Sequence, residues 1–387
     1  MMRSNRPVRI LAPVRPSTQF WPDLAAREFR RILIIKPSAV GDIVRTLPVL
    51  TALRRRWSDA HIAWLVARHC SEVLAGHPAL NQVIYFDRKA YASVGRDLSI
   101  TQAFTGFLRE LRGCRFDLVI DIQGLFRSGF FSLATGAGVR IGRGDSREFT
   151  GFFYTHRAAV DERRMHAIVL NAGMVAPLGV KVEPSTSDLY ISPEARTGAA
   201  RVLRSEGLEA GEPYAVIAPG SNWETKNWPA ARFGHVAAGL RRRWGLRAVV
   251  VGTGGQAGMA EEIRGQEPSV IDLCGKSTLA ELVAVIAGAR IVVANDSGPM
   301  HIADALDIPL VGLFGPTRPE IVGPFRRTDG VIRATLPCLG CGIKRFSGCP
   351  AGHRCMTSLG AEEVLDVAAM QLQRPGPRGT ASVQGAA

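Results

Sequence analysis

The sequence predicts an α/β protein built from two doubly wound domains that face each other across a cleft. Three observations lead to this prediction. Short apolar runs that fit buried parallel strands alternate along the chain with amphipathic segments of helical length. The alternation stops once, around residues 179–193, and then starts again. The chain has 387 residues, enough for two domains that each bury a hydrophobic core.

The first alternating region begins with an apolar run at residues 31–36, which fits a strand buried on both faces. A helix is predicted over residues 43–57, where apolar side chains recur at helical spacing. The other predicted elements are strands at residues 61–66, 82–86 and 117–122 and helices from about residue 70 and over residues 100–111. Because strands and helices alternate, the sheet is predicted to be parallel with helices on both faces.

The second alternating region begins with a strand at residues 214–218 and a helix over residues 230–244. A further helix near Pro299 directly follows an apolar run. The other predicted elements are strands at residues 248–251, 291–294 and 310–314 and helices over residues 279–288 and 361–372. This region repeats the organisation of the first, so a second doubly wound domain is predicted.

These patterns divide the chain into four segments. Residues 1–30 carry several arginines and prolines and are predicted to form a flexible, basic arm. The two domains are predicted at residues 31–185 and 186–372, and a stretch with Pro, Ser and Thr joins them. Residues 373–387 contain Gly, Pro and Ser and are predicted to be a disordered tail.

The charge of the chain is unevenly distributed. There are 48 Lys and Arg against 34 Asp and Glu, a formal net charge of +14. Residues 1–190 have 27 basic and 16 acidic residues, a net of +11, which leaves +3 for residues 191–387. A basic first half favours an anionic partner such as nucleic acid, anionic lipid or a phosphorylated saccharide, although solubility alone would also explain it. No run of about 18 apolar residues and no signal-peptide block is found, so a cytoplasmic, membrane-surface protein is expected.

One acidic residue follows the first predicted strand. Asp42 ends the segment that runs from Lys36 through Ser38 and Gly41, at the carboxyl edge of the predicted sheet. Gly41 is predicted to permit a tight turn. Asp42 can be an ordinary cap of the following helix, which Asp favours, or a general base that takes a proton from an attacking hydroxyl. The segment lacks the Gly-Lys-Ser/Thr ending of a P-loop.

Three loops of the second half suit an anionic ligand. Residues 219–229 combine small and hydroxyl-bearing side chains with Lys226, whose charge would neutralise a phosphate. Residues 295–301 open a helix whose free N–H groups and dipole would face a diphosphate, or whose polar residues are mere caps. Residues 252–256 form a Gly-rich turn that could border a ribose or base, or simply be a turn. The first two loops together favour a nucleotide diphosphate more than either does separately.

Two further groups of residues each allow more than one interpretation. Gln123, Arg127 and Arg143 follow the strand at residues 117–122 and would suit an anionic acceptor, or form a solvated charged face. Cys338, Cys341, Cys349 and Cys355 lie within eighteen residues. Four thiols at this spacing permit a structural metal site, a disulfide clip or plain packing.

In their order and spacing, these motifs resemble glycosyltransferase family 9, the lipopolysaccharide core heptosyltransferases. The resemblance covers roughly residues 31–370. It is carried by residues 32–48, 117–124, 219–229, 295–303 and 313–317 and by the run around Cys349 and Cys355. It implies the GT-B fold, in which two Rossmann-like domains hold the acceptor and the nucleotide-sugar respectively. Many members have an acidic residue where Gln256 stands here.

The resemblance also implies a reaction. Family members transfer a heptose, typically from ADP-heptose, to Kdo–lipid A or a growing inner core, with inversion and without a required cofactor or catalytic metal. It implies that Asp42 is the general base. The implied donor-binding residues are Ser221, Asn222, Lys226, Gly252, Gln256, Asp296, Ser297, Gly298 and His301. The predicted acceptor-binding residues are Lys36, Ser38, Gly41, Gln123, Arg127 and Arg143.

The implied partners are a nucleotide-sugar, an anionic glycolipid and the inner surface of the cytoplasmic membrane. Two alternatives remain at this point. One is a family 9 transferase with another nucleotide-sugar or with an acceptor other than lipopolysaccharide. The other is a non-enzymatic, basic nucleic-acid-binding protein, against which the aromatic content of 7% and the absence of interleaved aromatic and basic residues argue.

Overall fold

A computed structural model describes residues 20–145, 150–183 and 189–374 of the chain. The described chain divides into two compact units between Ser192 and Pro193. Each unit contains one six-stranded, fully parallel sheet, as the sequence predicts. Among the described helices, none combines the length and apolar character that crossing a bilayer requires.

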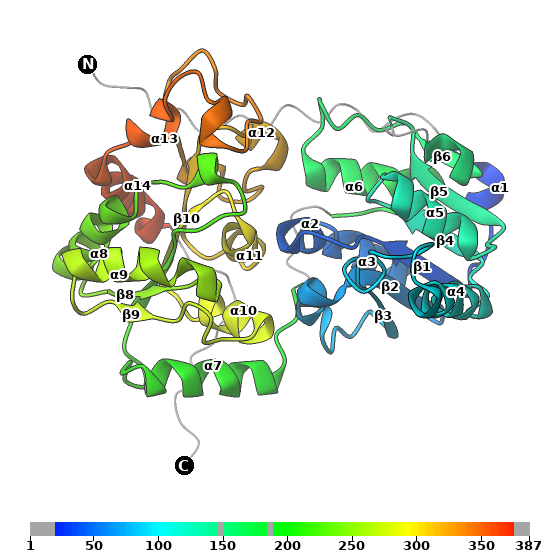
Figure 1. Ribbon diagram of the computed structural model, residues 1–387, viewed down its shortest axis with the longest axis horizontal. Coiled ribbons are helices and arrows are strands. Elements are labelled where there is room, and N and C mark those ends of the chain that lie inside the picture. Colours follow the sequence, from blue (N-terminus) through cyan, green and yellow to red (C-terminus); the bar gives the residue numbers. More distant parts are fainter. Residues whose placement is uncertain (1–19, 146–149, 184–188, 375–387) are drawn as a thin grey trace. The chain divides into compact units, whose positions relative to one another are not determined.

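The sheet of the first unit has the strand order β3-β2-β1-β4-β5-β6 (Figure 1). Its strands are β1 (Arg31–Ile35), β2 (His61–Ala67), β3 (Gln82–Phe86), β4 (Leu118–Asp121), β5 (Val139–Arg143) and β6 (His156–Ala158). Its helices are α1 (Pro22–Ala25), α2 (Val40–Val44), α3 (Leu47–Arg56), α4 (Leu98–Gly113), α5 (Phe126–Ala134) and α6 (Ala167–Val175), with 3₁₀ turns η1 (Arg68–Leu74), η2 (Thr150–Phe153) and η3 (Ala176–Leu178).

Strand β1 is covered on both faces. Leu33 and Ile35 pack into a core that includes Phe107 of α4 and Phe131 of α5. The alternate residues Ile32 and Ile34 are equally buried. The four consecutive apolar residues of β1 fit such an interior position, which explains the continuous apolar run in the sequence.

The predicted helix over residues 43–57 is two helices instead. Helix α2 ends at Val44, and α3 begins at Leu47 with Pro48 in its first turn. A proline lacks the N–H that would continue the earlier helix, so a new helix starts there. The helix predicted from about residue 70 is the 3₁₀ turn η1, and Gly76 follows it with a φ of 68°.

The boundaries of the first unit differ from those predicted. The prediction of a flexible arm over residues 1–30 is wrong for residues 20–30, which are ordered, because Phe29 is buried edge-on against Trp57. Residues 1–19 lie outside the described residues. At the other end, Tyr190 packs on Gly76 and keeps the chain with the first unit as far as Ser192, beyond the expected boundary at residue 185.

The second sheet has the order β12-β11-β10-β7-β8-β9, which repeats the topology of the first. Its strands are β7 (Tyr214–Ala218), β8 (Arg247–Val250), β9 (Ile271–Asp272), β10 (Ile291–Asn295), β11 (Leu310–Phe314) and β12 (Val331–Arg333). Its helices are α7 (Pro193–Ser205), α8 (Ala230–Trp244), α9 (Ala257–Gln266), α10 (Leu279–Ala287), α11 (Gly298–Ala305), α12 (Pro319–Val322), α13 (Arg354–Thr357) and α14 (Ala361–Gln373), with 3₁₀ turns η4 (Glu224–Lys226), η5 (Gly254–Gln256), η6 (Thr328–Gly330) and η7 (Phe346–Gly348).

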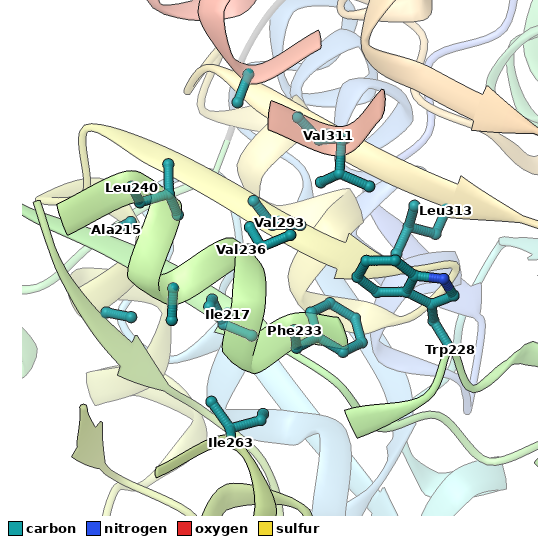
Figure 2. Packing of buried hydrophobic residues seen from close by; sticks show 14 of the residues in the cluster. Ala215, Ile217, Trp228, Phe233, Val236, Leu240, Ile263, Val293, Val311 and Leu313 are labelled. Carbon is teal, nitrogen blue, oxygen red and sulfur yellow. The ribbon is translucent and has the colours of Figure 1, made fainter. Parts of the chain in front are cut away.

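The core of the second unit lies between its sheet and helices α8, α9 and α14 (Figure 1). Figure 2 shows Trp228 and Phe233 in this core. Their ring centroids are 4.9 Å apart and the rings are nearly perpendicular. Trp228 donates its indole N–H to the carbonyl of Leu359. This large buried side chain therefore fixes the end of the loop that follows β7. The described part of the predicted tail shows α14 ending at Gln373, and residues 375–387 lie outside the described residues.

Candidate active site

Both sheets have a strand order in which the direction of the connections reverses between two central strands. Ligands of doubly wound folds bind outside the carboxyl ends of the strands at this point, because the following loops diverge there. In the second unit the two strands are β7 and β10, and in the first they are β1 and β4. Lys226 and Asp296 follow the first pair of strands, and Asp42 and Gln123 follow the second pair.

The two loops of the second unit are joined by Asn295, the last residue of β10. Its Nδ2 donates to the carbonyl of Pro219 over 2.5 Å, and its Oδ1 accepts the N–H of Trp228 over 3.2 Å. Ser221 shapes the loop from within, since its Oγ lies 2.8 Å from the carbonyl of Trp223. Asn222 is exposed in the same loop. The loop between Pro219 and Trp228 is thus held at both ends against β10.

A buried carboxylate lies between these loops. Asp296 Oδ2 is 2.7 Å from Lys226 Nζ and accepts the hydroxyl of Thr317 over 2.7 Å. His301 Nε2 is 3.7 Å from Asp296 Oδ1. Burial alone would raise the pKa of Asp296, but His301 and Lys226 hold that pKa well below its ordinary value. The ionised carboxylate therefore orients a cation, a hydroxyl and an imidazole at the carboxyl edge of the sheet.

Helix α11 begins beside this carboxylate. Ser297 is its N-cap residue and Gly298 is its first residue, so the free N–H groups of the first turn lie at the same edge. The Oγ of Ser297 is buried and has no hydrogen-bond partner among the described residues. A helix N-terminus with an unused hydroxyl beside a lysine is suited to bind an anion such as a phosphate.

The Gly-rich turn after β8 contacts the loop after β7 through Gln256. Its Oε1 accepts the N–H of Thr253 over 2.9 Å. A Cβ atom placed on Gly220 would lie 1.8 Å from Gln256 Nε2, and one placed on Gly252 would lie 2.3 Å from Oε1. A larger residue at either position would displace the Gln256 amide, which fills the space between them.

In the first unit, Asp42 is the third residue of α2 and about one third exposed. Its Oδ2 accepts the N–H of Ala39, as a helix-capping carboxylate does, and its Oδ1 lies 2.5 Å from Arg45. Burial would raise the pKa of Asp42, but the charges of Lys36 and Arg45 hold it well below its ordinary value. Asp42 is therefore ionised at neutral pH, and its capping geometry is compatible with the ionised form that a general base needs.

The three residues before Asp42 that were predicted to bind the acceptor differ in their surroundings. Lys36 is buried, and its burial lowers its pKa although Asp42 and Asp121 act in the opposite direction. Ser38 is half-buried in the loop that precedes α2. Gly41 lies inside α2 with helical backbone, so the prediction that it permits a tight turn is wrong.

The loop after β4 is held by Asp121, which the sequence analysis did not assign a role. Its carboxylate accepts the N–H groups of Gln123 and Gly124 and the hydroxyl of Tyr154. Burial raises the pKa of Asp121 despite these hydrogen bonds. The side-chain Oε1 of Gln123 is buried without a hydrogen-bond partner among the described residues. A polar residue at the end of a buried strand is the signal that could have found Asp121.

The two arginines predicted to bind an acceptor differ. Arg143 bonds to Asp145 with two nitrogens, each at 2.9 Å, and to Glu162 at 2.6 Å. Two carboxylates therefore balance its charge, and its packing against Gly124 makes it part of the scaffold of the loop. Arg127 is exposed, and its guanidinium lies 5.7 Å from the ring centroid of Phe86.

The four clustered cysteines form neither of the bonded arrangements considered. All seven cysteines of the chain are free. The part of the chain that the structure describes contains no group of three or more His, Cys, Asp or Glu able to hold a metal ion, so the structural metal considered at the cysteine cluster is not supported. Cys355 instead packs in the hydrophobic core, where burial raises the pKa of its thiol to about 11.

Comparisons with known proteins agree with this architecture. The model of glycosyltransferase family 9 (heptosyltransferase) matches residues 104–347. Lipopolysaccharide heptosyltransferase 1 of Pseudomonas aeruginosa is 29% identical over 315 residues, which cover 80% of this chain and 86% of that protein. The crystal structure of a family 9 glycosyltransferase from Veillonella parvula covers 89% of this chain and 98% of its own, with a TM-score of 0.75 and 24% identity.

A further solved structure, E. coli heptosyltransferase WaaC with ADP-2-deoxy-2-fluoro heptose, has a TM-score of 0.68 and 24% identity. The alignment covers 88% of this chain and 99% of that one. These two structures confirm the predicted GT-B fold, and the family model matches more than half of the chain. The chain therefore belongs to glycosyltransferase family 9 and is a glycosyltransferase.

Proposed function

We propose that the enzyme transfers a heptose from ADP-heptose to the inner core of lipopolysaccharide, with Kdo–lipid A or heptosyl-Kdo–lipid A as acceptor. The observation that carries this proposal is the arrangement of Lys226, Asp296 and the start of α11, which suits an anion. It lies where a doubly wound domain binds a nucleotide. The family relative from P. aeruginosa is a lipopolysaccharide heptosyltransferase, and the similar E. coli structure contains an ADP-heptose analogue.

In the proposed reaction, Asp42 accepts the proton of the acceptor hydroxyl while the oxygen attacks the anomeric carbon of the donor. The bond between that carbon and the phosphate oxygen breaks, and ADP leaves as the anion. Attack from the side opposite the leaving group inverts the anomeric centre. Lys226 and the N–H groups at the start of α11 stabilise the charge that develops on the diphosphate. No metal or other cofactor is part of this proposal.

We also propose that the enzyme works as a peripheral protein at the cytoplasmic surface of the inner membrane, where a lipid-linked acceptor is accessible. Exposed apolar side chains of the first unit support this. Phe152 is 85% exposed and Phe126 is 54% exposed, on the adjacent elements η2 and α5. Helix α5 contains Arg127 and no acidic residue. Exposed aromatic side chains beside a basic one suit an anionic lipid surface.

The decisive experiment is a mass-spectrometric assay of the purified chain with ADP-heptose and truncated lipopolysaccharides, with and without a chelator. Addition of one heptose to a defined truncated core is expected under both conditions. A panel of other nucleotide-sugars tests the alternative that the enzyme uses another donor, and turnover only with one of those would replace the present proposal. The non-enzymatic nucleic-acid-binding alternative does not fit a chain that belongs to a glycosyltransferase family.

A further inference from the structure

The donor site has a shortage of free positive charge. Lys226 is the predicted phosphate-binding cation, but its Nζ lies 2.7 Å from the buried carboxylate of Asp296. For a group farther away than this separation, the positive charge of Lys226 and the negative charge of Asp296 largely cancel. A diphosphate carries several negative charges, so a cation that no carboxylate already neutralises would add to the binding that Lys226 and the start of α11 supply.

Lys344 is such a cation. Its Nζ lies 5.0 Å from the ring centroid of Trp223, and Lys226 Nζ lies 4.4 Å from the same centroid. Lys344 is exposed, and no carboxylate of the described residues lies within 4.0 Å of its Nζ. An ammonium group is attracted to the face of an indole ring, so Trp223 helps to keep both lysines beside the same loop.

The position of Lys344 is not that of a loosely attached surface lysine. Its neighbour Ile343 accepts the hydroxyl of Thr225 through its carbonyl over 2.5 Å. His353 Nε2 lies 2.9 Å from the carbonyl of Thr225. Phe346 donates its N–H to Glu224, and its ring contacts that of His353 with centroids 4.7 Å apart. The segment over residues 338–355 is therefore bonded to the residues that directly precede Lys226.

We infer that Lys344 binds the diphosphate of the donor together with Lys226, and that the cysteine-bearing segment over residues 338–355 is part of the donor site. Thr225, His353 and Phe346 hold that segment against the loop. This inference rests on the proposed use of a nucleoside-diphosphate sugar. It explains why a segment so far along the chain from Lys226 is bonded to the loop after β7, and it assigns the segment a role that does not depend on its thiols.

The test is isothermal titration calorimetry of the full chain with ADP and, separately, with adenosine. Lys344→Ala is expected to weaken ADP binding by about tenfold, the usual effect of losing one charge-assisted contact, and to leave adenosine binding unchanged. Lys344→Arg keeps the charge and is expected to restore most of the affinity. Arg242→Ala is the matched control, because Arg242 is also exposed but lies near the end of α8, about 18 Å from its start.

Each outcome decides a different point. If the wild-type chain binds ADP and Lys344→Ala binds it equally well, the inference about Lys344 is wrong while the proposed function stands. If Lys344→Ala weakens ADP and adenosine to the same extent, the residue acts on the fold of the loop and the inference also fails. If the wild-type chain binds no ADP but binds another nucleoside diphosphate, the proposed donor is wrong, and the inference about Lys344 stands only if Lys344→Ala weakens binding of that nucleotide.

Discussion

The carboxyl edges of the two sheets use an aspartate in opposite ways. In the second unit, Asp296 is 5% exposed and gives its oxygens to Lys226 and Thr317. In the first unit, Asp42 is 35% exposed, and one oxygen faces Arg45 while the other caps α2. Both carboxylates are held ionised by neighbouring cations. The difference in exposure is consistent with the roles proposed above, in which Asp42 contacts a substrate hydroxyl and Asp296 orients the groups that contact an anion.

The strongest test of this comparison is to remove the proposed base. Asp42→Asn is expected to lower kcat by about a hundredfold to ten-thousandfold, because proton transfer by a positioned group contributes that much. ADP affinity should remain nearly unchanged, since the donor residues belong to the second unit. Turnover is measured by mass spectrometry and ADP affinity by calorimetry.

The matched control for this variant is Asp59→Asn, an exposed aspartate of the same unit that follows α3. It should leave both quantities unchanged. Asp42 is not the base if the Asp42→Asn enzyme turns over at a rate close to that of the wild type.

The corresponding substitution in the second unit, Lys226→Ala, is expected to affect the binding of ADP. Lys226→Ala removes the proposed phosphate contact and leaves the buried charge of Asp296 without its nearest cation. We expect the Kd for ADP to rise by about ten- to a hundredfold. Calorimetry with ADP measures this, and the thermal midpoint of unfolding shows whether the loss of the ion pair also destabilises the unit. Unchanged ADP affinity would remove Lys226 from the donor site.

The sequence predicts β1, β4, β7 and β10, whose carboxyl ends carry these residues, because continuous apolar runs bounded by turn residues favour buried parallel strands. It does not predict β5, β6, β9 or β12, which lack such a run. The partners of each side chain were not predictable, because they come from distant parts of the chain. Arg143 looks like a free cation in the sequence, yet Glu162 and Asp145 neutralise it in the fold.

The same limit applies to residues that the sequence analysis left without a role. Thr317 lies shortly after the end of β11, so its place at the carboxyl edge of the sheet could have been predicted. Its hydrogen bond to Asp296 could not be predicted from the sequence. The cysteine spacing favoured a metal or a disulfide as much as packing, because spacing along the chain does not show where the thiols point. In the structure, the hydrogen bonds of Thr225 and His353 organise that segment instead.

The two units also differ in the proposed membrane contact, which belongs to the first unit alone. Phe126→Ser combined with Phe152→Ser removes the two exposed rings on α5 and η2. Co-sedimentation with vesicles that contain anionic lipid is expected to fall by about fivefold, as expected for the loss of interfacial apolar area. Met370→Ser, at a half-exposed apolar residue of α14 in the second unit, is the control and should bind as the wild type does. Equal sedimentation of all three proteins would show that this face does not contact lipid.

The smallest expected effect concerns the pH dependence of the proposed base. Lys36 and Arg45 hold the pKa of Asp42 well below its ordinary value, so the wild-type enzyme should keep its base ionised throughout the mildly acidic range. Arg45→Ala removes one of these charges and must raise the pKa of Asp42. Because only the ionised form accepts a proton, the acidic limb of the profile of kcat/KM against pH should move to higher pH in this variant. Arg45→Lys keeps the charge and should leave the limb near its wild-type position. If the limb does not move in Arg45→Ala while the variant remains folded, either Arg45 does not control Asp42 or another group limits the reaction in acid.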